Sequence, residues 1–178
     1  MKYRPLGASG LEVSEIGFGA WGIGGLTDGM TSYGATDDGE SLRALEHALA
    51  IGINFFDTSN VYGSGHSETL IGRAFSSCRD QVIIASKAGF TAYDAPLDFS
   101  PGHLRKSLEQ SLIRLGSDYL DLFQLHNPPP ALLRDTPEIG ETLAALKTEG
   151  LIRAHGVSAK GPDEAIGAMA PSTGATRA

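Results

Sequence analysis

Four side chains that can hold or transfer protons stand at or just after the ends of apolar segments. They are Asp57, Tyr62, Lys87 and His126. A carboxylate, a phenol, an amine and an imidazole are the groups that proteins use as acids, bases and hydrogen-bond donors. Each one alone also has a structural interpretation, as a turn cap, a solvated charge or a hydrogen-bonded core residue. Their chemistry therefore depends on whether the fold brings them together.

The elements that would position these side chains alternate between strand and helix. Short runs rich in β-branched and aromatic residues predict five strands, and the segments between them carry helix start and stop signals. A small β-hairpin, formed by residues 3–6 and 11–13 around a Ser-Gly turn, precedes them. The predicted strands cover residues 16–21, 53–58, 82–86, 119–125 and 154–158.

Successive strand–helix units imply a parallel sheet with right-handed crossovers, either a doubly wound sheet or a (β/α)8 barrel. A doubly wound dinucleotide fold would place G-x-G-x-x-G after its first strand and an acidic ribose partner further on. The acidic partner is missing at the usual offset, which favours the barrel. Glycines do crowd the region of the first strand, at Gly17, Gly19, Gly22, Gly24 and Gly25.

The chain is too short for a whole barrel. A complete (β/α)8 barrel takes about 250 residues, whereas this chain has 178. We therefore expect an α/β fold, a partial TIM barrel of about five βα units over residues 1–169, with an unstructured tail at 170–178. Because barrel chemistry sits at the carboxyl ends of the strands, Asp57, Lys87 and His126 would face one mouth.

Three separated motifs then identify a resemblance. The stretch N-F-F-D-T-S-N-V-Y-G-S-G-H-S-E at 54–68 resembles the signature of the aldo-keto reductases. The run K-Y-R-P-L-G-A-S-G-L-E-V-S-E-I-G-F-G-A-W at 2–21 and the segment 104–128, ending D-L-F-Q-L-H-N-P, are similar to the same family. The resemblance covers residues 2–168 and decides for the barrel, truncated after the fifth βα unit.

The resemblance implies an NADPH-dependent oxidoreductase that reduces aldehydes or ketones, or oxidises alcohols or sugars, by hydride transfer. It makes Tyr62 the general acid, Lys87 and Asp57 its ion-paired supports, and His126 the group that orients the carbonyl. These roles agree with the chemistry of the reaction. Hydride attack on a carbonyl builds negative charge on its oxygen, and a nearby proton donor neutralises that charge. A cation beside a phenol also favours its ionised form and so eases proton release.

The cofactor implied by the resemblance is NADP(H). Its nicotinamide end would lie near Ala20, Trp21 and Asp57, and its carboxamide near Ser158. The chain departs from the family at Ala159, where the family usually has Asn, which removes one hydrogen bond. The family's contacts to the pyrophosphate and the 2′-phosphate lie on strands six to eight, which we do not expect in this chain.

Two other functions remain open. One is a catalytically inactive barrel fragment that self-associates through exposed parallel edges, with two chains closing a shared barrel. The other is a Schiff-base enzyme that uses Lys87.

Composition and charge limit the classes of partner that the protein can bind. The formal net charge of −7 disfavours nucleic acid as a partner, and no apolar run is long enough to predict a membrane span. Together with a single cysteine, Cys78, and no recognisable export signal, this predicts a cytoplasmic protein. The histidines show no ligand spacing with acids or Cys78, so no metal site is predicted. The expected partner is a small carbonyl, alcohol or sugar.

Overall fold

The computed structural model describes residues 1–26, 33–92 and 94–169, so the predicted tail at 170–178 lies outside the described residues. Within them, the main sheet has five parallel strands in the order β3-β4-β5-β6-β7, and β1 and β2 form an antiparallel hairpin. This confirms the predicted α/β fold, a partial barrel preceded by a hairpin. The strands are β1 Tyr3–Pro5, β2 Glu12–Ser14, β3 Phe18–Gly19, β4 Phe55–Asp57, β5 Ile83–Ala88, β6 Leu120–His126 and β7 Ile152–Ser158.

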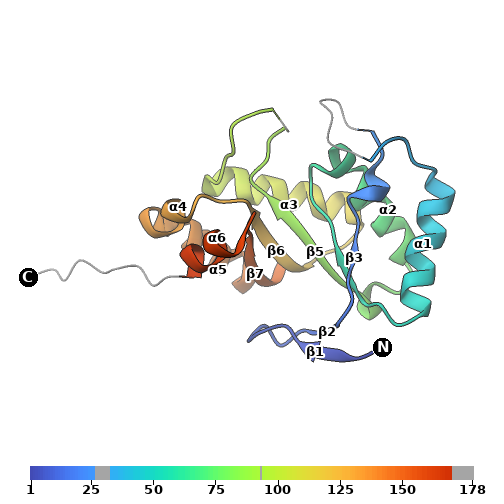
Figure 1. Cartoon of the computed structure of the whole chain (residues 1–178). Helices are drawn as coiled ribbons and strands as arrows, with labels where there is room; N and C mark the ends of the chain where they lie inside the picture. The colour runs from blue at the N-terminus through green and yellow to red at the C-terminus, as the bar shows by residue number, and fades with distance from the viewer. Residues whose placement is uncertain (27–32, 93, 170–178) are drawn as a thin grey trace, which may run out of the picture.

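Helices connect successive strands, as parallel pairing requires (Figure 1). Their ends follow the capping residues of the sequence: Asp37 accepts a hydrogen bond from the amide of Glu40 at 2.7 Å, and Gly116 ends a helix with φ of 60°. The helices are α1 Asp38–Ala50, α2 His66–Phe75, α3 Pro101–Leu115, α4 Pro130–Asp135, α5 Pro137–Thr148 and α6 Pro162–Met169. Short 3-10 turns occur at η1 Gly22–Gly24, η2 Tyr62–Gly65 and η3 Arg79–Gln81.

Two elements differ from the sequence prediction. The first strand is only Phe18–Gly19, because the chain turns into η1 directly after Trp21. The short helix α4 was not predicted, because the prolines at 128–130 favour a loop, yet Pro130 occupies the first helical position, where its missing N–H costs nothing.

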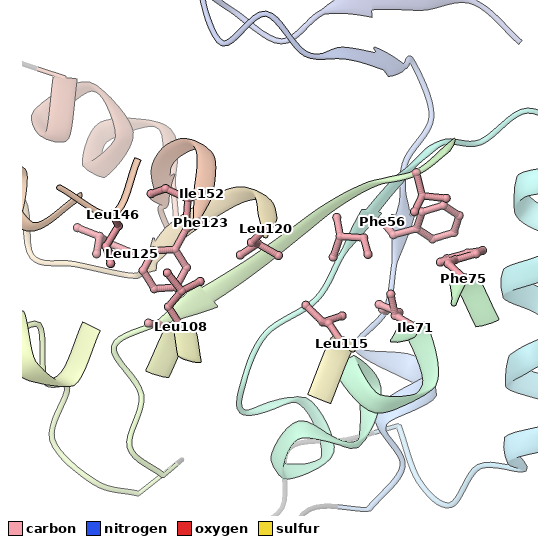
Figure 2. Close-up of a cluster of buried hydrophobic side chains, with 14 of the residues drawn as sticks. Phe56, Ile71, Phe75, Leu108, Leu115, Leu120, Phe123, Leu125, Leu146 and Ile152 are labelled. Carbon is pink, nitrogen blue, oxygen red and sulfur yellow. The ribbon is translucent and has the colours of Figure 1, made fainter. Parts of the chain in front are cut away.

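The larger hydrophobic core lies between one face of the sheet and the helices. Figure 2 shows Phe56 of β4 and Phe123 of β6 pointing into this layer with side chains such as Ile71, Leu108 and Leu146. No helix among the described residues is both long and apolar enough to cross a bilayer.

The opposite face of the sheet is covered at one end by the N-terminal hairpin. Leu11 and Val13 pack there against Ile83 and Ala154. The hairpin is tied to the residue just before β4, since the Asn54 side chain accepts from the Ser14 amide at 2.7 Å. The hairpin thus lies at the amino end of the sheet (Figure 1) and does not cover the carboxyl ends of the strands.

Candidate active site

The strand register places a row of polar side chains on the inner face of the sheet, which is the face covered at one end by the hairpin. Side chains alternate across a strand, so residues two apart share a face. On β5 this sets Lys87 on the side of Ile83, which packs on the hairpin. Lys87 pairs with Gln124, and His126 pairs with Ser158, in the parallel register.

The centre of the site is the amine of Lys87. Its Nζ donates to the Asp57 carboxylate, to the carbonyl oxygen of Thr58 at 2.7 Å and to Tyr62 Oη at 3.5 Å. The same nitrogen lies 5.0 Å from the centre of the Tyr62 ring. The structure therefore brings together the predicted carboxylate, amine and phenol, from β4, β5 and η2.

Lys87 is 3% exposed. Burial lowers the pKa of its ammonium, and the Asp57 carboxylate opposes this shift by favouring the charged form. Asp57 is itself positioned from its other side, because the Gln124 side chain donates to its second oxygen at 3.1 Å. Gln124 was not among the predicted residues, although its place two residues before His126 put it on the same face.

His126 lies beside the phenol. Its ring centre is 6.1 Å from that of Tyr62 and 4.8 Å from that of Phe90, edge-on in both cases. Its Nδ1 lies 3.1 Å from the hydroxyl of Ser59. Burial, and then the positive charge of Lys87, lower the pKa of His126 to about 4. The imidazole is therefore neutral at neutral pH.

The segment that carries Tyr62 has an unusual backbone. Gly63, Ser64 and Gly65 have φ of 58°, 53° and 94°, a region that glycine tolerates and serine rarely adopts. A Cβ on Gly63 would lie 2.0 Å from the carbonyl oxygen of Gly24, so η2 rests directly on η1. The G-S-G run after Tyr62 was the sequence signal for this turn, and the prediction overlooked it.

The predicted cofactor residues divide into two groups. Ala20 is fully buried, its amide donates to the Asp57 carbonyl at 2.8 Å, and its carbonyl accepts from Ser67 at 2.8 Å. It therefore lies beneath the site. Trp21 and Ser158 are half-buried at the carboxyl end of the sheet, and the Trp21 ring lies 6.3 Å from that of Tyr62.

Aromatic and polar residues gather around the phenol at the carboxyl end of the sheet. The Trp21 ring lies near that of Tyr62, and Ser158 pairs with His126 in the strand register. An aromatic ring with a few polar groups is the kind of lining that a flat, amide-bearing ring requires. Directly after His126, Asn127 has φ of 55°, and its amide donates to the Ser158 carbonyl at 2.7 Å. This left-handed residue, which asparagine adopts more readily than most, ties the ends of β6 and β7 together.

Comparison with known proteins places this geometry in context. Residues 15–171 match the family model described as "Aldo/keto reductase family". The chain is 39% identical to aldo-keto reductase YhdN of Bacillus subtilis over 162 residues, 89% of this chain and 47% of that protein. It is 35% identical to the NADH-specific methylglyoxal reductase of Escherichia coli over 176 residues, 89% of this chain and 52% of that protein.

Among solved structures, the holo form of aldo-keto reductase AKR11C1 from Bacillus halodurans superposes with a TM-score of 0.77 at 34% identity. The match covers 92% of this chain and 52% of that one. The chain thus spans about half the length of the relatives it matches.

Proposed function

This chain belongs to the aldo/keto reductase family, and we propose that it reduces aldehyde or ketone groups with NADPH, or oxidises alcohols or sugars in reverse. The observation that carries the proposal is the amine of Lys87, held between the Asp57 carboxylate and the Tyr62 phenol. The neutral imidazole of His126 beside that phenol adds a second polar group of the required type.

The bound nicotinamide would supply a hydride to the carbonyl carbon. Tyr62 then gives its phenolic proton to the carbonyl oxygen as the C=O π bond breaks, which leaves an alcohol and a phenolate. Lys87 stabilises that phenolate from 3.5 Å. Because the amine is buried, water screens its charge little, and Asp57 and Thr58 hold it in place.

His126 would orient the substrate. A neutral imidazole carries one N–H and can donate a hydrogen bond from it to the same carbonyl oxygen. It does not compete with Tyr62 as the group that transfers the proton. The low pKa of about 4 keeps this state over the physiological range. The ring lies at the carboxyl end of β6, the end at which barrel enzymes place their chemistry, so a substrate would approach it there.

Trp21 and Ser158 would hold the nicotinamide end of the cofactor, and Asp57 would act through Lys87. Ala20 supports the wall behind them, since both of its backbone polar groups bond within the protein. NADPH is the proposed donor, and NADH is the comparison to make, because one relative is named as NADH-specific. A small aldehyde is the proposed substrate class, with methylglyoxal a suitable probe since that relative is named for it.

The test is oxidation of NADPH with nitrobenzaldehyde and with methylglyoxal. Tyr62→Phe keeps the ring and removes the proton, so kcat/KM should fall by about 10²- to 10⁴-fold. Tyr119→Phe is the matched control, because Tyr119 precedes β6 at the amino end of the sheet and should retain activity. Equal turnover by wild type and Tyr62→Phe would refute the assignment of the acid.

A second function is favoured by one observation. The inner face of β6 and β7 and the hairpin turn border an open hollow of about 630 Å³. Its wall is largely apolar, with Leu122, Ala154 and Val157 among the lining residues, and such surfaces are normally covered. The alternative is therefore a chain without catalysis that associates with a second copy through this face.

Two measurements separate the functions. Saturable quenching of Trp21 fluorescence by NADPH, with a monodisperse monomer by light scattering, favours the reductase. Concentration-dependent association without NADPH binding favours the chain without catalysis.

A further inference from the structure

Buried Ser59 and His126 meet although 67 residues separate them in the chain. Ser59 is 0% exposed and His126 is 9% exposed. The Ser59 hydroxyl lies 3.1 Å from Nδ1 of the imidazole. A neutral imidazole has one protonated nitrogen and one lone pair, so this contact bears on which nitrogen carries the proton.

The Ser59 hydroxyl has a single proton and two acceptors within reach. One is His126 Nδ1, and the other is Asn60 Oδ1 at 3.2 Å. The Asn60 amide is oriented by its nitrogen, which donates to the Phe90 carbonyl at 3.0 Å, so its oxygen faces Ser59. If the proton goes to Asn60, Nδ1 must carry its own proton and donate to Ser59. If it goes to His126, the imidazole proton sits on Nε2.

The two alternatives differ in hydrogen-bond strength. An imidazole nitrogen is far more basic than an amide oxygen, and a hydrogen bond to the stronger base gains more where water is scarce. The contact to His126 is also the shorter of the two.

We propose that Ser59 donates its proton to Nδ1 of His126 and thereby keeps the imidazole in the Nε2–H form. Ser59 is then a positioning residue, and Nε2–H is the donor available to a carbonyl oxygen. This functional reading rests on the proposed reductase activity, whereas the tautomer itself does not.

The test uses the whole chain labelled with ¹⁵N-histidine, without substrate or cofactor, near neutral pH. Two-bond ¹H–¹⁵N correlation spectra distinguish the tautomers, and His126→Gln identifies the His126 signals by their loss. Wild type should show a protonated Nε2 and an unprotonated, hydrogen-bonded Nδ1. A protonated Nδ1 in wild type overturns the proposal, whether or not any variant folds.

Two variants sharpen the result. Ser59→Ala removes the donor, so the His126 signals should move to values averaged over both tautomers. Asn60→Ala removes the competing acceptor and should retain the Nε2–H pattern. A Ser59→Ala spectrum in which His126 is unchanged also overturns the proposal.

Kinetics connects the tautomer to catalysis. When only a fraction of the protein is binding-competent, apparent affinity falls by that fraction. Ser59→Ala should therefore raise the aldehyde KM by about twofold to tenfold with little change in kcat. A chain without any turnover but with the Nε2–H form would refute the reductase proposal and leave the tautomer assignment standing.

Discussion

Nζ of Lys87 lies 3.5 Å from Oη of Tyr62, and the same amine is almost wholly buried. A strand and a separate turn supply these two groups, so the contact exists only in the folded chain. Burial lowers the pKa of this ammonium, so a positive charge on Lys87 costs stability in the folded chain.

Replacement of Lys87 by Met should separate activity from stability. The variant keeps the length of the side chain and removes a charge whose burial opposes folding near neutral pH. We expect kcat/KM for an aldehyde to fall by about 10²-fold or more. The melting temperature should change little, because the Asp57 carboxylate left behind is 33% exposed and keeps the Gln124 donor. Activity assays and thermal unfolding test this, with exposed Lys106→Met as the control. A strongly destabilised variant that retains full turnover would contradict both expectations.

His126 should make stability depend on pH. Its pKa is about 4 in the folded protein against an ordinary value of 6.5, so the unfolded chain binds a proton first as the pH falls. Stability from this residue is present above about pH 6.5 and is lost as the pH falls towards 4. The contribution is on the order of 3 kcal/mol.

Urea unfolding at several pH values measures this contribution. The difference in unfolding free energy between wild type and His126→Gln should shrink as the pH falls through this window. The same substitution at His47, on the exposed face of α1, should give the same dependence of unfolding free energy on pH as the wild type. Parallel profiles for wild type and His126→Gln would contradict the prediction.

Asp121 joins three strands at the amino end of the sheet. Its fully buried carboxylate accepts from Arg79 at 2.7 Å, from Arg153 at 2.7 Å and from the Ile84 amide at 3.0 Å. Asp121→Ala would remove the acceptor of the buried Ile84 amide. It would also remove the charged partner of Arg79, whose largely buried guanidinium would keep only neutral oxygen acceptors. We expect a loss of about 3–5 kcal/mol in the free energy of unfolding.

The matched control for Asp121 is Arg153→Ala. The Arg153 side chain is 51% exposed, so water replaces the lost contact, and the expected loss is about 1 kcal/mol or less. Denaturant titration measures both. Equal losses for the two variants would show that the buried carboxylate is not the centre of this network.

Gly63 and Gly140 should respond oppositely to alanine. At Gly63 a Cβ would lie 2.0 Å from the Gly24 carbonyl oxygen, and φ is 58°. The turn that carries Tyr62 must then shift, so both stability and turnover should fall. At Gly140, within α5, a Cβ meets nothing within 4 Å, and helix propensity predicts a gain of about 0.5–1 kcal/mol. Calorimetry and an aldehyde assay on both variants test the contrast.

Short-range sequence patterns determined much of the fold. The alternation of strand and helix, the cap at Asp37 and the glycine stop at Gly116 are all read from neighbouring residues, because the physical effects involved act within a few residues. The same short-range patterns placed Asp57, Lys87 and His126 at strand ends, and the motifs around them identified the family.

The surroundings of those side chains were decided only by the tertiary structure. Nothing near Lys87 in the sequence indicates that Gln124 holds its partner Asp57, and nothing near His126 indicates that Ser59 meets its Nδ1. Such partners depend on strand register and on the path of connecting loops. Burial acts likewise, since the pKa of His126 is lowered by its burial in the folded chain and by the charge of Lys87 on a different strand. Residue types were therefore readable from the sequence, whereas their protonation and orientation followed from the packing of distant segments.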